Sequence, residues 1–305
     1  MTNQFALPAQ AGPEIPSRRG VLGAALGGAA LAGCAATGRP AVPDAAAEAG
    51  LARLVAGAPR CSLAPTETEG PFPLRAMLAG DALLRADITE GRPGVPLALR
   101  IKLVDVTRGC RALAGAWVYV WHCDRDGKYS GYDDMAGASP SPTTFLRGIQ
   151  KTDADGCVTF STVYPGWYEG RITHIHCMVF LAGASLTSAS PSQATTQFAF
   201  PADATAAVYA SRLYGKGPNM SVLRLEDDNV FGDGAVSEML TLTGSVDAGF
   251  AAGIVVGVDP SVSNPVMADG PSGGMPPPGG LPRPPRMGFG APPRGALPRG
   301  RGGPP

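Results

Sequence analysis

Short segments in which apolar and polar residues alternate run through the middle of the chain. The clearest is 97–103, where every second residue is apolar (Leu97, Leu99, Ile101 and Leu103), the period of a half-buried β-strand. Similar short segments predict strands at 116–123, 158–164, 173–181, 195–200, 238–246 and 252–258. Because Gly, Pro, Asp and Ser separate these segments, the pattern predicts an all-β fold, a β-sandwich of mostly antiparallel short strands.

Helical periodicity is weak and predicts only two short helices, within 45–55 and within 202–213. The C-terminal end has a different composition, with 12 Pro and 11 Gly in residues 270–305. Such a segment cannot bury enough apolar surface to offset the entropy lost on ordering. We therefore expect a folded domain at 61–262, preceded by a tether at 35–60 and followed by a disordered tail at 263–305.

The first 34 residues have the pattern of an export signal. The Arg18-Arg19 pair precedes a mildly apolar run at 23–32 and small residues before Cys34. The run is shorter than the roughly 20 residues that a membrane-spanning helix needs. Its end, Leu-Ala-Gly-Cys, resembles a bacterial lipobox, in which the cysteine is acylated. We expect residues 1–34 to be a disordered twin-arginine leader of an exported protein, periplasmic or on the cell surface, with a lipid anchor at Cys34 as its contact with the membrane.

Charge and cysteine content narrow the classes of function. The 25 basic and 25 acidic residues cancel and charged residues make up only 16% of the chain, so composition gives no reason to propose a nucleic acid partner. If Cys34 is lipidated, five of the six cysteines remain, which allows at most two disulfides whose pairing the sequence leaves open. No cysteine pair has the CxxC spacing of a zinc cluster.

Two of the three histidines, His174 and His176, lie two residues apart on the strand predicted at 173–181. Side chains in a strand alternate between its faces, so both imidazoles share one face and make a ready pair of metal ligands, while Ile175 takes the other. Tyr129 follows an Asp-Gly turn and Tyr168 follows a Pro-Gly turn. Their phenolates are hard anionic ligands that suit Fe(III). The third histidine, His122, lies between Trp121 and Cys123 on a predicted strand and is interpreted as structural.

Five segments in this order resemble the intradiol ring-cleavage dioxygenase family, the catechol and protocatechuate dioxygenases with non-haem Fe(III). They are 65–72, 127–129, 152–168, 171–176 and 196–198, and the resemblance covers roughly residues 61–262. It implies an Fe(III) site whose ligands are Tyr129, Tyr168, His174 and His176. It further implies that Tyr168 accepts a proton from the substrate and that Arg171 and Gln197 support the negative charge on it.

The activity implied by the resemblance is cleavage of a catechol-type aromatic by O2 between its two hydroxyl-bearing carbons, giving a muconate-type product. Homo-oligomers occur in the family, so the resemblance also admits one here. Many relatives have Tyr where this chain has Phe72. The missing hydroxyl leaves the identity of the substrate open.

Two other readings of the pattern compete with this one. A cupin-type metal site needs a Glu shortly after the second histidine, and residues 177–181 contain no carboxylate. A lipid-anchored β-sandwich could instead bind an aromatic or sugar ligand without catalysis. Bound ferric iron would separate this binding module from the enzyme.

Overall fold

We describe the fold from a computed structural model, which describes residues 45–56, 61–132 and 141–264. The predicted leader, including Cys34, lies outside these residues, as do residues 35–44 and 57–60 of the predicted tether and the predicted tail from residue 265 onwards.

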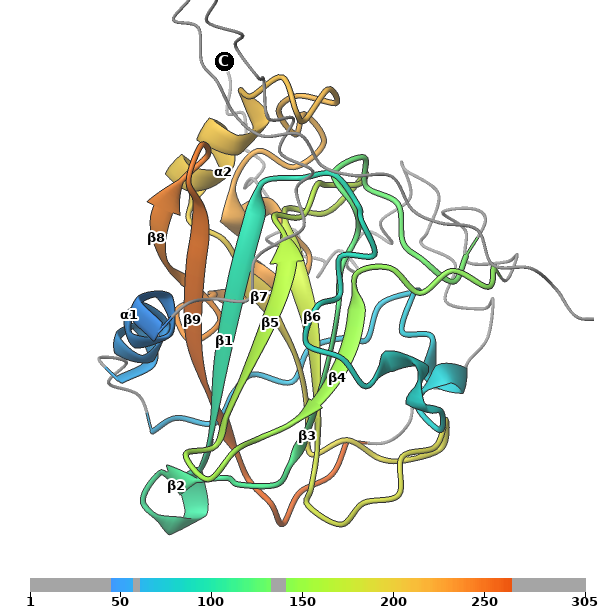
Figure 1. The fold of residues 1–305 in the computed structure, drawn as a ribbon, viewed down its shortest axis with the longest axis vertical. Helices are drawn as coiled ribbons and strands as arrows, with labels where there is room; N and C mark the ends of the chain where they lie inside the picture. Colours follow the sequence, from blue (N-terminus) through green and yellow to red (C-terminus); the bar gives the residue numbers. More distant parts are fainter. Residues whose placement is uncertain (1–44, 57–60, 133–140, 265–305) are drawn as a thin grey trace, which may run out of the picture. The chain divides into compact units, whose positions relative to one another are not determined.

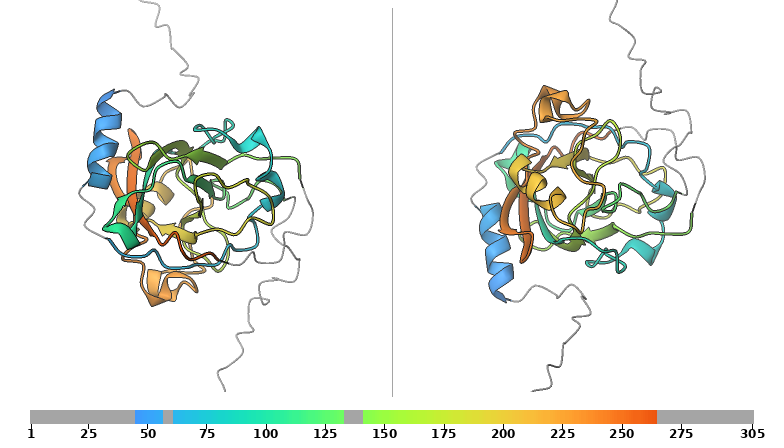
Figure 2. Two further views of the ribbon diagram at one scale, coloured as in Figure 1. Left: turned by 90° about the horizontal axis from the view of Figure 1, so that it is seen from below. Right: turned by 90° about the horizontal axis from the view of Figure 1, so that it is seen from above.

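Two β-sheets face each other in the described part of the chain (Figures 1 and 2). The first contains β1 (Pro96–Asp105), β2 (Arg111–Ala112), β5 (Cys157–Val163), β8 (Thr241–Ser245) and β9 (Gly249–Val258). The second has the strand order β4 (Arg147–Lys151), β3 (Trp117–Trp121), β6 (His174–Phe180) and β7 (Ala194–Ala199). Of these pairings only β1 with β9 is parallel. The predicted β-sandwich of mostly antiparallel strands is confirmed.

The main core lies between the two sheets and follows the alternation along the strands. The four alternating residues of β1, from Leu97 to Leu103, are buried in it. The second sheet contributes Val118 and Val120 of β3 and Ile175 of β6. Because neighbouring residues of a strand face opposite ways, this places the histidines of β6 on the outer face of the second sheet.

That outer face is also buried, under a separate apolar cluster. Tyr119 and Trp121 of β3 pack there with Phe72, Leu78 and Leu83, which come from the segment leading into β1. The 3₁₀ helices of the described chain are Arg75–Met77, Asp81–Leu83, Val106–Arg108, Leu225–Asp227 and Phe231–Asp233. The two in the covering segment hold Leu78 and Leu83 against the sheet, so the second sheet is enclosed on both faces.

The two α-helices are α1 (Ala45–Ala56) and α2 (Ala202–Tyr209), close to the predicted ranges. Figure 1 shows α1 beside β9. Leu51 and Val55 of α1 are buried, and Glu48 accepts a hydrogen bond from Arg100 of β1 at 3.0 Å. The helix that the sequence places in the tether therefore packs on the first sheet. Neither of the described helices has the length and apolar character needed to cross a membrane.

The sequence pattern did not predict β2 or β4. Strand β4 reads Arg-Gly-Ile-Gln-Lys, which lacks the expected alternation because Arg147 is fully buried and satisfied by hydrogen bonds. Gly148 lies so close to Ile88 that a Cβ there would come within 2.4 Å of it. Contacts with distant segments, which the local pattern does not contain, therefore determine this strand.

One disulfide, Cys61–Cys110, joins the chain before Gly70 to the turn after β1. Cys123, Cys157 and Cys177 are free and buried. One disulfide among the described cysteines agrees with the expected maximum of two.

Replacing both Cys61 and Cys110 by Ser should lower the free energy of unfolding by about 2–4 kcal/mol, because the unfolded chain loses a cross-link between residues 49 positions apart. Denaturant unfolding without reductant measures the effect. Reductant should move the wild-type midpoint to that of the double variant and leave the variant unchanged. Equal midpoints for the two oxidised proteins would contradict the prediction.

Candidate metal centre

The two histidines of β6 point their Nε2 atoms toward each other at 3.2 Å. His174 Nδ1 lies 2.6 Å from the carbonyl oxygen of Ile172, so Nδ1 carries the proton and Nε2 keeps a free lone pair. Burial, reinforced by Arg171, lowers the pKa of His174 well below 6.5. Burial, with His174 as the next cause, does the same for His176. Both imidazoles are therefore neutral near pH 7 and available as ligands.

Packing against Trp121 and Gly70 helps to orient the His176 ring. Trp121, the residue of β3 that pairs with His176, stacks on this ring with the two ring centroids 4.7 Å apart and an angle of 3° between the planes. Gly70 covers the ring edge, where a Cβ would approach His176 Cε1 to 3.1 Å. The buried Nδ1 of His176 has no hydrogen-bond partner in the described structure. Rotation of this ring is blocked by its apolar neighbours.

Both predicted tyrosine ligands lie against the histidines. Tyr129 Oη is 3.3 Å from His174 Nε2, and the Tyr168 ring lies 5.7 Å from the rings of both Tyr129 and His174. All four side chains are buried. Across the residues described, no group of three or more His, Cys, Asp and Glu could hold a metal. A metal here would thus need the phenol oxygens as well as the imidazoles.

Backbone packing between two loops brings the tyrosines together. Gly127, two residues before Tyr129, has φ +86°, and a Cβ there would lie 2.2 Å from the carbonyl oxygen of Trp167. Gly166, two residues before Tyr168, donates to the carbonyl of Asp124 at 3.1 Å. At position 127 only glycine allows both the left-handed conformation and the close approach to the Trp167 carbonyl. The Asp-Gly and Pro-Gly turns predicted from the sequence are therefore the points at which the two tyrosine-bearing loops contact each other.

Burial disfavours the charged form of both phenols. It raises the pKa of Tyr129 well above 10 and that of Tyr168 to about 12, an effect that Arg171 partly offsets. A phenolate at either position therefore needs a strong local positive charge. The donor chemistry, two imidazole nitrogens and two phenol oxygens converging in a buried site, fits a ferric ion.

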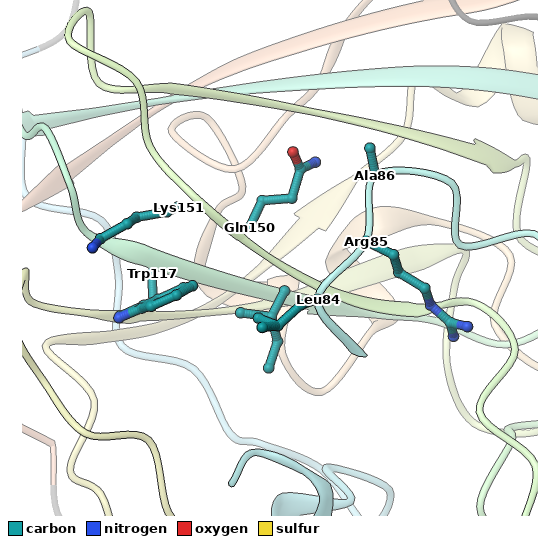
Figure 3. A pocket seen from close by; sticks show the side chains of 7 residues that line it. Leu84, Arg85, Ala86, Trp117, Gln150 and Lys151 are labelled. Atoms are coloured by element: carbon teal, nitrogen blue, oxygen red, sulfur yellow. The ribbon is translucent and has the colours of Figure 1, made fainter. Parts of the chain in front are cut away.

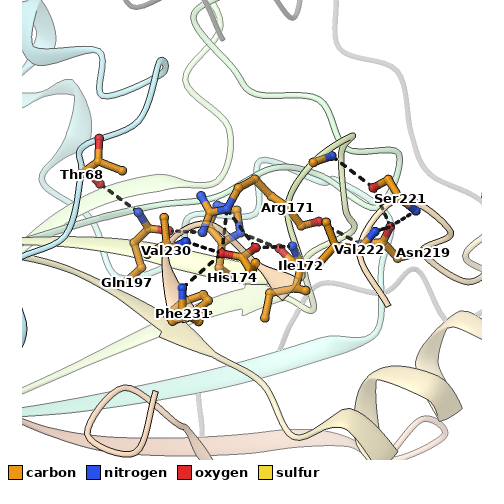
Figure 4. Close-up of polar contacts among 12 residues, drawn as sticks. Thr68, Arg171, Ile172, His174, Gln197, Asn219, Ser221, Val222, Val230 and Phe231 are labelled. Carbon is orange, nitrogen blue, oxygen red and sulfur yellow. Dashed lines mark hydrogen bonds and ion pairs between the residues drawn. The ribbon is translucent and has the colours of Figure 1, made fainter. Parts of the chain in front are cut away.

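Arg171 has a buried partner that sequence reasoning missed. Its Nε donates to Asp228 Oδ2 at 3.0 Å, and its Nη2 donates to Gln197 Oε1 at 2.7 Å (Figure 4). Asp228 also accepts from the backbone nitrogen of Ile172 at 2.8 Å. Because Asp228 belongs to the acidic run 226–228, its sequence context is that of an exposed turn. No local signal distinguishes it from its neighbours.

Gln197 lies directly opposite His176 in the pairing of β6 with β7. Besides accepting from Arg171, its amide donates through Nε2 to the carbonyl of Thr68 at 2.9 Å (Figure 4). Both ends of the amide are therefore in use. Gln197 links Arg171 to the predicted active-site segment 65–72.

Phe72 closes the tyrosine side of the cluster. Its ring stacks on Tyr129 at 4.6 Å and meets the edges of Tyr132 and Tyr168 at 5.1 and 6.3 Å. Arg147 donates to the carbonyls of Phe72 and Ser130, each at 2.7 Å. This arginine holds the backbone beside Tyr129.

His122 is structural, as predicted. Its Nδ1 lies 2.8 Å from the carbonyl of Cys123, and its Nε2 lies 2.7 Å from Thr162 Oγ1. Both ring nitrogens are satisfied, and burial lowers its pKa to about 4.

A hollow of about 300 Å³ elsewhere on the surface contains none of the site residues (Figure 3). Its lining residues are Leu84, Arg85, Ala86, Trp117, Ile149, Gln150 and Lys151. The Arg85 guanidinium pairs with Glu90 at 2.6 Å and so is not free for an anionic ligand.

Comparisons with known proteins show similarity to dioxygenases. Residues 69–209 match a family model described as Dioxygenase. Catechol 1,2-dioxygenase 1 of Acinetobacter lwoffii is 27% identical over 157 residues, which are 46% of this chain and 47% of that protein. The match thus spans about half the length of the curated relative. The solved intradiol ring-cleavage dioxygenase of Tetranychus urticae is 27% identical, with a TM-score of 0.59, over 68% of this chain and 99% of that one.

Gly127→Ala should destabilise the protein by at least about 3 kcal/mol, because the methyl group meets the Trp167 carbonyl in a strained conformation. Gly183→Ala is the matched control, since Gly183 has φ +82° but nothing within 4 Å of the added carbon. Strain alone should cost the control about 1 kcal/mol. Denaturant unfolding compares the two, and equal losses would argue against close packing of the tyrosine loops.

The pKa of His122 predicts a loss of stability in acid. Because the folded-state pKa is about 4, below the ordinary 6.5, the neutral ring contributes its full stability above pH 6.5 and loses it as pH falls toward 4. The loss is on the order of 3 kcal/mol. His122→Gln cannot titrate and should lose correspondingly less between pH 7 and pH 4, measured by unfolding of the iron-free protein. An unchanged pH dependence would contradict the assignment.

Proposed function

Because the chain belongs to the intradiol ring-cleavage dioxygenase family, we propose that it cleaves a catechol-type aromatic with O2 between the two hydroxyl-bearing carbons. The product is then a muconate-type diacid. The convergence of two buried imidazoles and two buried phenols is the observation that supports this most strongly. The curated relative supports a catechol as the substrate class.

The proposed cofactor is non-haem Fe(III), held by Tyr129, Tyr168, His174 and His176. When bound, ferric iron would supply a Lewis acid that draws electron density from the catecholate oxygens. The fixed Nδ1 proton of His174 directs its Nε2 lone pair into the cluster. Stacking on Trp121 directs the His176 ring to the same point.

Tyr168 is the proposed proton acceptor for the catechol. Burial raises the pKa of the metal-free Tyr168 phenol to about 12, so a phenolate at this position that is not bound to a metal is a stronger base than one in water. Transfer of a catechol proton to Tyr168 Oη gives the neutral phenol that the buried site favours. The nearby Arg171 guanidinium is placed to interact with that oxygen in its charged form.

Arg171 supports negative charge on the substrate as part of a fixed pair. Asp228 largely balances its charge and, with Gln197, fixes the plane of the guanidinium. A donor whose orientation is set before reaction stabilises developing charge without reorganisation. Gln197 acts in this proposal through Arg171, because its Oε1 accepts from the Arg171 guanidinium while one of its two Nε2 hydrogens is donated to the carbonyl of Thr68.

The Arg18-Arg19 pair and Cys34 motivate the proposal that the enzyme works outside the cytoplasm as a lipid-anchored protein. Its catechols would then be aromatics met there. Metabolic lipid labelling of the wild type and Cys34→Ser, followed by cell fractionation, would test the anchor. Equal labelling of the two proteins would refute it.

The full chain loaded with Fe(III) should show a tyrosinate-to-iron charge-transfer band in the visible region. Anaerobic catechol should shift the band, and admission of O2 should restore it while a muconate forms. Tyr129→Phe and Tyr168→Phe should each shift and weaken the band and lower kcat by at least about a hundredfold. Mutation of residues that only hydrogen-bond to metal ligands already costs up to about a hundredfold in activity, and loss of a ligand itself should cost at least as much.

Tyr164→Phe is the matched control, because this buried tyrosine bonds to Thr205 away from the cluster. It should keep the band and the activity. A wild-type protein that binds catechol but gives no band after ferric loading and consumes no O2 would refute the proposal and favour the binding module.

A further inference from the structure

The loop 216–222 crosses the backbone segment 167–171, which carries Tyr168 between β5 and β6. Four hydrogen bonds join the two. They are Lys216 Nζ to the Trp167 carbonyl (2.8 Å), Trp167 Nε1 to the Gly217 carbonyl (2.9 Å), Asn219 Nδ2 to the Arg171 carbonyl (2.9 Å) and Gly170 N to Ser221 Oγ (3.1 Å). Figure 4 shows the contacts of Asn219 and Ser221. The bonded residues lie on both sides of Tyr168.

Both ends of this loop are anchored in the fold. Tyr214, just before the loop, is buried, and its hydroxyl accepts from the backbone nitrogen of Val95 at 3.2 Å. Val222 at the other end is also buried. The loop is therefore held in place at both ends.

Asn219 shapes the loop as well as gripping the segment. Its Oδ1 accepts from Ser221 N and Ser221 Oγ, each at 2.9 Å, and from Val222 N at 3.2 Å. The acceptor side of the amide thus builds the turn. The donor side alone reaches the Arg171 carbonyl, so the two roles can be separated by substitution.

The contact between Lys216 and Trp167, at the first end of the loop, involves both tyrosine-bearing loops. The Trp167 carbonyl that accepts from Lys216 is the one packed against Gly127, two residues before Tyr129. The Lys216 ammonium also lies 3.7 Å from the centre of the Trp167 ring. The loop therefore holds the junction from which both phenols extend.

From this geometry we propose that Asn219 is a positioning residue for the centre, which fixes Tyr168 and Arg171 through the backbone that joins them. The role rests on the proposed function. The loop lies beyond residues 69–209, the part matched by the family model. Its four hydrogen bonds to segment 167–171 reach Trp167, Gly170 and Arg171 rather than the imidazole or phenol groups. A backbone shift of about 1 Å can cost roughly a hundredfold in rate when it displaces a reacting group.

Asn219→Asp tests the role, because the carboxylate keeps the acceptor for Ser221 and Val222 but places an oxygen against the Arg171 carbonyl. We expect the charge-transfer band to move, iron to be lost at least about tenfold faster, and kcat to fall by about 10–100-fold. The unfolding midpoint should stay close to that of the wild type. Asn229→Asp is the matched control, since Asn229 is exposed and the substitution makes the same change in charge. It should match the wild type throughout.

Amide exchange in the iron-free protein gives a readout independent of activity. Ser221→Ala removes the acceptor of the Gly170 amide, which should exchange at least about tenfold faster, measured by NMR. Suppose that the Gly170 amide exchanges faster in Ser221→Ala, while Asn219→Asp keeps the charge-transfer band and kcat of the wild type. The loop would then be purely structural, and the proposal would be overturned. Exchange, band and kcat all like the wild type would overturn it too. A wild-type protein without the band would remove the metal centre itself, and this role with it.

Discussion

The alternation of side chains along β6 is the constraint on which the rest of the structure depends. Ile175, Cys177 and Val179 fill the core between the sheets, and this forces His174 and His176 onto the outer face. A shift of one residue in register would exchange the two sets and leave imidazoles in an apolar core. The same burial that stabilises the sandwich therefore sets the direction of the two nitrogen ligands.

Enclosure of the outer face gives the site its chemistry. The segment from Gly70 to Leu83 covers the second sheet, so the imidazoles and phenols lie out of water. Burial keeps the histidines neutral and makes free phenolates unfavourable. Each change prepares the group to meet a cation, because a metal restores the stabilisation that water would have given.

Support for the cluster comes from charges and amides that do not belong to the proposed ligand set. Asp228 and Gln197 fix Arg171, Arg147 holds the backbone beside Tyr129, and Asn219 grips the carbonyl of Arg171. These contacts restrict the non-strand segments that carry the tyrosines. Such segments have no ladder of sheet hydrogen bonds to fix them, so their geometry depends on side chains from elsewhere in the chain.

The sequence by itself determined the described strands other than β2 and β4, the fold class, the shared face of His174 and His176, and the turns before the two tyrosines. These follow from the local periodicity of the backbone and from the conformations that glycine allows. Only the tertiary structure decided that β4 forms, that Gly127 meets Trp167, and that Asp228 and Asn219 reach Arg171 across 57 and 48 residues. An aspartate in an acidic run has the same local sequence whether it is solvated or buried. Its partner is set by the paths of distant segments, which no local pattern contains.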